Sequence, residues 1–168
     1  MYIKFREINK AEIPLIKKII ESNIRTDFPE YSQRIKEYIL KHELDLEEKL
    51  SISIFNVWGA FKEDKPVGYL IGFGPVGGVV EIHWLGVLKA LQGKGIATKF
   101  VEFFLDWAKN NGAHAIHLYS SKENLAFYEK LDFEKVGLIR KSFWGSDDYF
   151  MSKNIQEPRE DNFFKKSF

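Results

Sequence analysis

One glycine-rich stretch near the middle of the chain carries most of the information about the fold. It reads Leu85-Gly86-Val87-Leu88-Lys89-Ala90-Leu91-Gln92-Gly93-Lys94-Gly95-Ile96-Ala97-Thr98. Small residues let a backbone turn sharply and leave its amide N–H groups uncovered. The first amides of a helix lack partners within the helix and carry partial positive charge, so phosphate groups bind there without basic side chains. The stretch therefore predicts either an anion-binding turn or a purely structural turn between a strand and a helix.

The segments on both sides of this stretch define a supersecondary unit. Residues 79–88 are apolar on both faces, which is typical of a strand buried in the middle of a sheet. Residues 96–108 repeat apolar side chains at helical spacing, and a stop follows at 110–112. Residues 114–120 form the next predicted strand. This order predicts a right-handed crossover between two parallel strands.

The rest of the chain alternates between helical and extended patterns. Two regions before the glycine-rich stretch are helical, and the pattern of the second is compatible with one bent helix or with two. The predicted elements are a strand at 2–7, helical regions at 13–21 and 31–50, strands at 52–62 and 67–73, a turn at 74–78, a short helix at 124–131, and strands at 134–140 and 149–154. This order predicts a mixed α/β fold.

The composition is that of an ordinary globular protein. Of the 168 residues, 45% are apolar and 29% are charged, which argues against disordered, collagen-like and fibrous classes. A net charge of +1 argues against a general nucleic-acid binder, and the lack of cysteine excludes disulfides and a thiol nucleophile. Without an apolar run of membrane length or a signal-peptide pattern, we expect a cytoplasmic protein without membrane, nucleic-acid or metal partners. We expect one domain over 1–153 and a charged tail over 154–168.

Several other patterns resemble functional motifs but are better interpreted as structural. Residues 72–77 match G-x-G-x-x-G, yet a strand follows them, so a hairpin turn is favoured over a dinucleotide site. His114 and His117 lie three apart on a predicted strand and point to opposite faces, which disfavours a shared metal ion. His42 lacks a second histidine at zincin spacing, and no nucleophile elbow surrounds Ser120.

The combination of motifs resembles one enzyme family. Gln92-Gly93-Lys94-Gly95-Ile96-Ala97 resembles the Q/R-x-x-G-x-G/A pyrophosphate loop of the GNAT superfamily of N-acetyltransferases, and Leu85-Gly86-Val87 resembles the L-x-V element before it. Residues 124–133 are similar to the second-helix signature, which often ends Y-E-K-L-G-F, and residues 149–153 to the last strand. The resemblance implies a mostly antiparallel mixed sheet, flanked by helices, with a central splayed pair of parallel strands.

The resemblance also implies acetyl-CoA as co-substrate. The backbone of Leu85 and Val87 is expected to contact the pantetheine arm in the gap between the splayed strands. Main-chain amides are expected to hold the pyrophosphate, at Gln92, Gly93, Lys94, Gly95, Ile96, Ala97 and Thr98. The second signature is expected to add Asn124, Phe127 and Tyr128.

Two positions depart from the family pattern. Asp132 stands where the second signature usually has glycine, which implies a changed turn before Phe133. Asn124 lies closer in sequence to Tyr128 than the usual asparagine lies to its tyrosine, and this spacing argues against a contact between Asn124 and CoA.

The implied reaction is direct acetyl transfer to an amine, which needs a general acid and a general base. Tyr128 matches the family tyrosine that donates a proton to the leaving sulfur. For the base we expect Glu81, acting through water, because some family members carry a catalytic glutamate six residues before the position of Val87. Glu81 is also the lone acid in an apolar strand, and His83 on the same face is a competing base. The alternatives are a packing role for Tyr128 and a lysine-paired or solvent-facing Glu81.

The acceptor is less defined. In the family, the first two helices and the loop between the last two strands line the acceptor groove, which implies residues 22–50 and 143–148 here. An acidic, aromatic pocket for a cationic amine would draw on Asp27, Phe28, Glu30, Tyr31, Trp144, Asp147 and Asp148. The alternative is solvated charges beside core aromatic residues. A small amine or polyamine is slightly preferred over a protein N-terminus or a lysine side chain.

Three functions from different classes remain open at this stage. The first is an acetyl-CoA-dependent N-acetyltransferase, the second is a CoA-binding sensor without turnover, and the third is an unrelated interaction domain with a structural glycine turn. The resemblance to the family also makes a homodimer an expected option.

Overall fold

The computed structural model describes residues 2–163. The chain packs as two compact units, one with the residues up to Gly72 and Trp84–Phe103, the other with Phe73–His83 and the residues from Phe104 onward. Within the described part of the chain, no helix has both the length and the apolar character that a membrane span needs. A single domain ending at residue 153 stays a prediction.

The described residues form a seven-stranded mixed sheet with strand order β1-β2-β3-β4-β5-β7-β6. The strands are β1 Lys4–Glu7, β2 Phe55–Lys62, β3 Lys65–Val76, β4 Val79–Val87, β5 Ala115–Ser120, β6 Glu134–Ile139 and β7 Asp148–Asn154. Strands β4 and β5 are parallel, with Glu81 opposite His117, and helix α4 (Ile96–Asn110) connects them. The predicted fold class and the crossover are confirmed.

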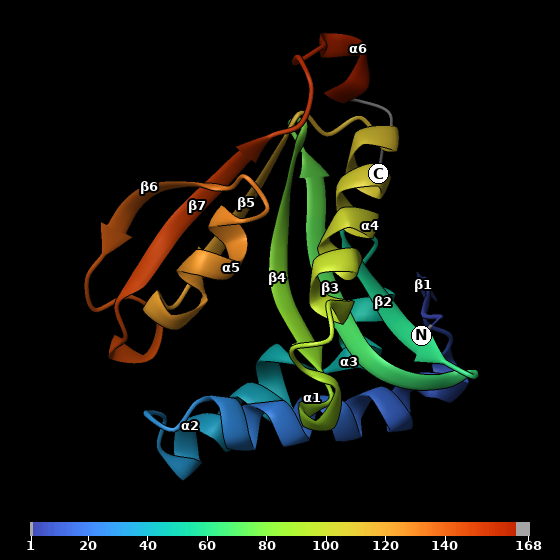
Figure 1. Cartoon of the computed structure of the whole chain (residues 1–168), viewed down its shortest axis with the longest axis vertical. Helices are drawn as coiled ribbons and strands as arrows, with labels where there is room; N and C mark the ends of the chain where they lie inside the picture. Colours follow the sequence, from blue (N-terminus) through green and yellow to red (C-terminus); the bar gives the residue numbers. More distant parts are fainter. Residues whose placement is uncertain (1, 164–168) are drawn as a thin grey trace. The chain divides into compact units, whose positions relative to one another are not determined.

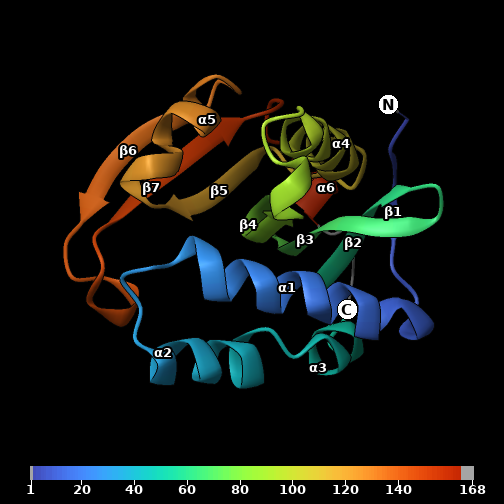
Figure 2. The same cartoon turned by 60° about the horizontal axis from the view of Figure 1, so that its bottom comes forward.

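Three helices pack beside one another in the first unit. Helix α1 (Ile13–Asp27) buries one face, and Figure 2 shows α2 (Gln33–Tyr38) and α3 (Leu46–Ser51) alongside it. The second helical region is thus two short helices, joined by a π-helical turn at Ile39–Glu43. Each has its own N-cap, because the Ser32 side chain accepts from Ile35 N at 3.3 Å and Asp45 accepts from Glu47 N at 3.1 Å.

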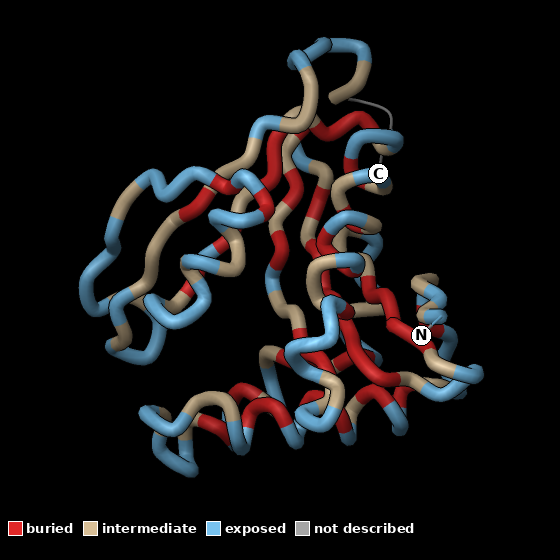
Figure 3. Tube along the Cα trace, in the orientation of Figure 1, coloured by how far each residue is buried: buried red, intermediate tan, exposed pale blue. Residues whose placement is uncertain are grey.

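The core of the first unit lies under one face of α1. Figure 3 shows buried stretches repeating along this helix, as its apolar periodicity predicts. Ile16, Ile20 and Ile24 are fully buried there with aromatic and aliphatic residues from β2 and β3. Phe100, on α4, is also buried, and its ring centroid lies 4.9 Å from that of Phe5.

The extended region differs from the prediction in the length of its second strand. Strand β3 runs on to Val76, although Gly74 and Pro75 are usually strand breakers and led us to expect a turn there. The turn is limited to Gly77 and Gly78, which have positive φ values of 56° and 78°. Because β4 follows this turn directly, the hairpin interpretation of the G-x-G-x-x-G pattern is confirmed.

In the second unit, β7 lies between β5 and β6 and is antiparallel to both. Figure 1 shows α5 (Leu125–Glu129) across these strands, and it contacts β6. A short helix α6 (Glu160–Phe163) follows β7, and its Phe163 ring lies 5.6 Å from the ring of His114. The tail residues Phe164 and Phe168 lie outside the described residues.

Asp132 has a backbone conformation that favours glycine, the residue usual at this place in the signature that the sequence resembles. Its φ is 60°, in the left-handed region that glycine adopts without strain and that aspartate tolerates. Its exposed carboxylate also lies 3.3 Å from Lys153 Nζ, an interaction of small expected value.

We expect Asp132→Gly to change the free energy of unfolding by less than about 1 kcal/mol, because relieved strain and added chain entropy oppose each other. We expect Asp132→Val to lower it by about 1–2 kcal/mol, because a β-branched residue is strained at positive φ. Urea denaturation of the two variants measures both values. Equal stability of the valine variant and the wild type would argue against the strain.

Candidate functional site

The glycine-rich stretch forms an open turn before α4. A 3-10 turn at Lys89–Leu91 leads to Gln92, and Gly93 and Gly95 then adopt φ values of 73° and 76°. A Cβ atom added at either glycine would meet nothing within 4 Å. Within residues 2–163, the N–H groups of Gly93, Lys94 and Gly95 donate to no main-chain carbonyl. Free amides and open space at a helix start suit a phosphate group.

The residues after this turn begin α4 and offer their backbone amides to a ligand. Lys99 N donates to Gly95 O at 3.2 Å, so the amides of Ile96, Ala97 and Thr98 belong to the first turn and lack partners within the helix. The Ile96 side chain is buried. The amides from Gly93 to Thr98 therefore lie together in one turn without such partners, whereas the predicted donor Gln92 N already donates to Lys89 O at 3.3 Å. Their contact with a pyrophosphate stays a prediction.

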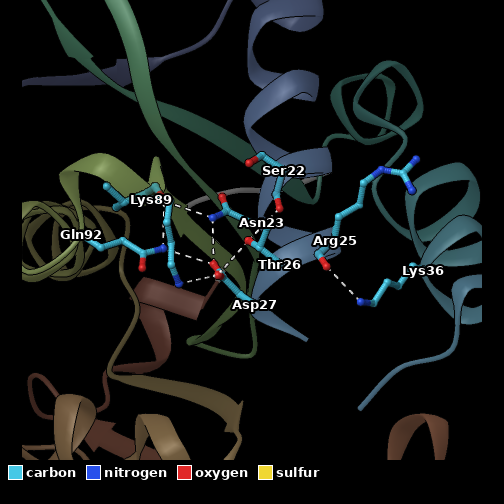
Figure 4. A network of polar contacts seen from close by, with 9 residues as sticks. Ser22, Asn23, Arg25, Thr26, Asp27, Lys36, Lys89 and Gln92 are labelled. Atoms are coloured by element: carbon cyan, nitrogen blue, oxygen red, sulfur yellow. Dashed lines mark hydrogen bonds and ion pairs between the residues drawn. The ribbon is translucent and has the colours of Figure 1, made fainter. Parts of the chain in front are cut away.

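A polar network holds the beginning of the turn to the end of α1 (Figure 4). Asp27 Oδ1 accepts from Lys89 Nζ at 3.0 Å, and Asp27 Oδ2 accepts from Gln92 Nε2 at 3.2 Å and from Asn23 Nδ2 at 2.9 Å. Burial alone would raise the pKa of Asp27, but the hydrogen bonds from Lys89, Asn23, Thr26 and Gln92 outweigh it and hold that pKa below its ordinary value. Asp27 is therefore a charged, fully engaged carboxylate rather than a free member of an acceptor pocket.

The same network occupies the last carbonyl of β4. Val87 O accepts from Asn23 Nδ2 at 3.1 Å and from Gln92 Nε2 at 3.2 Å, which uses both of its lone pairs. This carbonyl is therefore already engaged within the protein, and the expected contact of the Val87 backbone with the pantetheine arm stays a prediction. We still expect the backbone of the half-buried Leu85, two residues earlier on β4, to contact the pantetheine arm.

Gly86, between these two residues, leaves no room for a side chain. A Cβ atom there would lie 2.7 Å from Asn23 Oδ1 and closer still to the Tyr69 ring. Asn23 is only 4% exposed, and its Oδ1 atom has no hydrogen-bond partner. Burial, and secondarily the charge of Asp27, raise the pKa of Tyr69, so this phenol stays protonated.

In the second unit, the two candidate bases form a pair. His83 Nδ1 lies 3.1 Å from Glu81 Oε1, and the two side chains are 35% and 30% exposed. Glu81 therefore pairs with a histidine instead of a lysine, and its surroundings are more solvated than an apolar strand implies. Across the parallel pair, Glu81 faces His117. Burial lowers the pKa of His117, and the charge of Glu81 only partly offsets this, so His117 is neutral at pH 7.

Tyr128 lies on α5 between two aromatic rings. Its ring centroid is 4.8 Å from that of Phe127 and 5.6 Å from that of Phe133. Burial raises the pKa of Tyr128 above its ordinary value near 10, so it retains its proton at neutral pH. Asn124 immediately precedes α5, is exposed, and donates from Nδ2 to Ser121 Oγ at 3.4 Å.

The residues expected around the acceptor belong to both units. In the first, Phe28 stacks on Tyr31 at 5.3 Å and meets the edge of Trp84 at 5.9 Å, while Glu30 is exposed. In the second, Asp147 Oδ1 accepts from Lys141 N at 2.9 Å. The other members there are Trp144, with a φ of 58°, and Asp148, whose Oδ2 is buried without a partner.

The histidines set aside as structural each pack against an aromatic ring. His42 contacts Tyr38, His114 contacts Phe163, and His117 contacts Phe150. Among the described residues, no three His, Cys, Asp or Glu side chains gather in a way that could hold a metal ion.

Comparison with known proteins identifies the family. The model of the acetyltransferase (GNAT) family matches residues 17–133. The chain belongs to this family. GNAT membership confirms the resemblance drawn from the pyrophosphate-loop and second-helix motifs.

One curated relative and two solved structures illustrate what this chain is similar to. N-alpha-acetyltransferase RimI of Mycobacterium tuberculosis is 31% identical over 80 residues, which are 46% of this chain and 51% of the relative. The chain thus aligns with about half the length of this curated relative. The structure of PaiA N-acetyltransferase from Thermoplasma acidophilum, in complex with coenzyme A, is similar with a TM-score of 0.78 at 17% identity, over 92% of this chain and 99% of that one. The structure of an aminoglycoside 6'-N-acetyltransferase complexed with coenzyme A is similar with a TM-score of 0.68 at 21% identity, over 95% of this chain and 100% of that one.

We expect Gly95→Ala to raise the Kd for CoA about tenfold, because alanine at this positive φ costs about 1–2 kcal/mol and would shift the turn. Gly77→Ala is the matched control, since Gly77 also has a positive φ and an equally open Cβ position. Isothermal titration with CoA measures both variants. An equal rise in Kd for the two would mean that strain anywhere in the chain has this effect.

Sequence reasoning missed two features of the site. Asn23 belongs to no motif. The sequence places Asp27 with the acceptor, because no local pattern reveals its contacts with Lys89 and Gln92, which join positions more than 60 residues apart. Hydrogen bonds over such separations leave no local pattern in one sequence. The pairing of Glu81 with His83 was foreseeable from their two-residue spacing, which places both on one face of the strand.

Proposed function

We propose that this protein transfers an acetyl group from acetyl-CoA to a primary amine. The open turn at Gly93 and Gly95, directly before α4, carries this proposal, because its free amides and unfilled space fit a pyrophosphate. Acetyl-CoA supplies the activated thioester. The CoA complexes of two structural neighbours support the choice of this co-substrate.

Main-chain groups of the turn carry the proposed cofactor contacts. The amides from Gly93 to Thr98 hold the pyrophosphate, while the Gln92 side chain bonds within the protein. Leu85 offers its backbone to the pantetheine arm. Asn124 and Phe127 complete the proposed contacts beside Tyr128.

The pair of Glu81 and His83 supplies the proposed general base. An alkyl ammonium group with a pKa near 10 must lose a proton before its nitrogen can attack. Glu81 accepts this proton through a water molecule, and His83 Nδ1, 3.1 Å from the carboxylate, stabilises the arrangement. The amine nitrogen then bonds to the acetyl carbon as the C–S bond breaks. Tyr128 Oη gives its proton to the departing sulfur.

The proposed acceptor is a primary amine of one of two classes. The name of the Mycobacterium tuberculosis relative points to an α-amino group, and the name of the aminoglycoside enzyme points to a small polycationic amine. Asp27 is engaged by Lys89, which removes one of the acids that favoured a small cation. We therefore give both classes equal weight.

Thiol release from acetyl-CoA tests the proposal. The full chain is incubated with spermidine, an aminoglycoside, peptides with free N-termini, and N-terminally blocked peptides that contain lysine. We expect release with at least one class. Stabilisation by CoA without acetyl transfer to any acceptor would favour a sensor. For a micromolar Kd, a CoA concentration 100 times the Kd should raise the free energy of unfolding by about 2.7 kcal/mol. No stabilisation at this concentration would contradict CoA binding.

A further inference from the structure

We propose that Asp27 is a positioning residue that orders the turn at residues 88–95 and thereby increases affinity for the pyrophosphate of CoA. This inference rests on the proposed function, because it concerns the same turn. All residues of the argument lie in the first unit, and Figure 4 shows their arrangement.

The turn has little order of its own. Its two glycines have the largest conformational freedom of any residue type, and the amides of Gly93, Lys94 and Gly95 make no main-chain hydrogen bond within the described chain. The internal bonds that precede them are Leu91 N to Leu88 O at 2.8 Å and Gln92 N to Lys89 O at 3.3 Å. A ligand that had to order such a turn would bind more weakly by the entropy lost.

Restraint comes from outside the turn and converges on one carboxylate. Lys89 and Gln92, at the two ends of the 3-10 turn, both donate to Asp27. Asn23 adds a second anchor, because its Nδ2 atom donates to both Asp27 and the Val87 carbonyl, where the turn begins. These contacts join the buried end of β4 to the part of the turn that precedes its glycines.

The position of Asp27 in α1 is unfavourable for the helix itself. Asp27 is the last residue of α1, where the helix dipole carries partial negative charge and disfavours an acid. The donors from outside the helix offset this, and they hold the carboxylate in its charged form. Asp27 at this position therefore stabilises the contact with Lys89 and Gln92 and does not stabilise the end of α1.

Two effects of Asp27 on a phosphate ligand oppose each other. Its charge neutralises Lys89, which would otherwise attract the ligand, while its hydrogen bonds order the turn. Lys89 is 66% exposed, so solvent screens its charge strongly. We therefore expect ordering to dominate, and removal of Asp27 to weaken CoA binding.

The test compares Asp27→Ala with Glu21→Gln, an acid on the same helix that pairs with Arg25 and does not contact the turn. We expect the Kd for CoA to rise about tenfold in Asp27→Ala, less in Asp27→Asn, and not in Glu21→Gln. The KM for acetyl-CoA should rise equally, while the KM for S-acetylpantetheine, which lacks the pyrophosphate, should not change. Amide hydrogen exchange of residues 88–98 should accelerate in the ligand-free variant.

The outcomes separate this inference from the proposed function. An unchanged or lowered Kd for CoA in Asp27→Ala would overturn the inference, and so would equal losses with S-acetylpantetheine, which indicate general damage. Melting temperatures show whether the variants are folded. If the wild type bound no CoA, the proposed function would fail, whereas faster exchange in Asp27→Ala would still show that Asp27 orders the turn.

Discussion

Replacing Tyr128 with phenylalanine is expected to lower kcat by about 100-fold and to leave the Kd for CoA unchanged, because only the proton donor is lost. The ring would keep its contacts with Phe127 and Phe133, so the fold of α5 should be maintained. Steady-state kinetics and titration with CoA measure the two quantities. The deficit should shrink with a thioester of a more acidic thiol, since such a leaving group needs less help from an acid.

The pH dependence follows from the raised pKa of Tyr128. The protonated phenol is the active form, and burial raises its pKa, so this form persists to a higher pH than for an ordinary tyrosine. We therefore expect no alkaline loss of activity from Tyr128 below about pH 10. Tyr149→Phe on β7 is the matched control and should retain full activity. Undiminished turnover of Tyr128→Phe would leave this residue with a packing role.

Replacing Glu81 with glutamine should reduce kcat/KM for the amine by about 100-fold or more at neutral pH. Glutamine has nearly the same size and can still contact His83, but it cannot accept a proton. Binding of CoA should be unaffected, because Glu81 contributes no amide of the turn.

A second substitution identifies which member of the pair accepts the proton. If His83→Gln has the larger effect, His83 is the base and Glu81 orients its ring across the 3.1 Å contact. Glu134→Gln on β6, an exposed acid outside the pair, is the matched control. Activity of Glu81→Gln that matches the wild type across the pH range would remove Glu81 from the mechanism.

Local patterns in the sequence were sufficient to predict the fold wherever a short segment determines its own structure. The parallel pair and its helix were predictable, because the apolar run of β4 and the helical period of α4 are properties of contiguous residues. The turn at Gly93 and Gly95 was predictable for the same reason, since only glycine adopts such φ values without strain. The extension of β3 through Gly74 and Pro75 was not predictable, because the sheet keeps these two residues extended although both tend to break strands.

The sequence alone determined the family, the crossover unit around α4 and the open turn before that helix, because each depends on residues close together in the chain. Tertiary structure alone decided what Asp27 does. Its carboxylate contacts Lys89 and Gln92 across more than 60 residues, and this contact places it with the turn instead of the acceptor. It also decided that Glu81 faces His117, because strand register depends on packing between segments that no single stretch encodes.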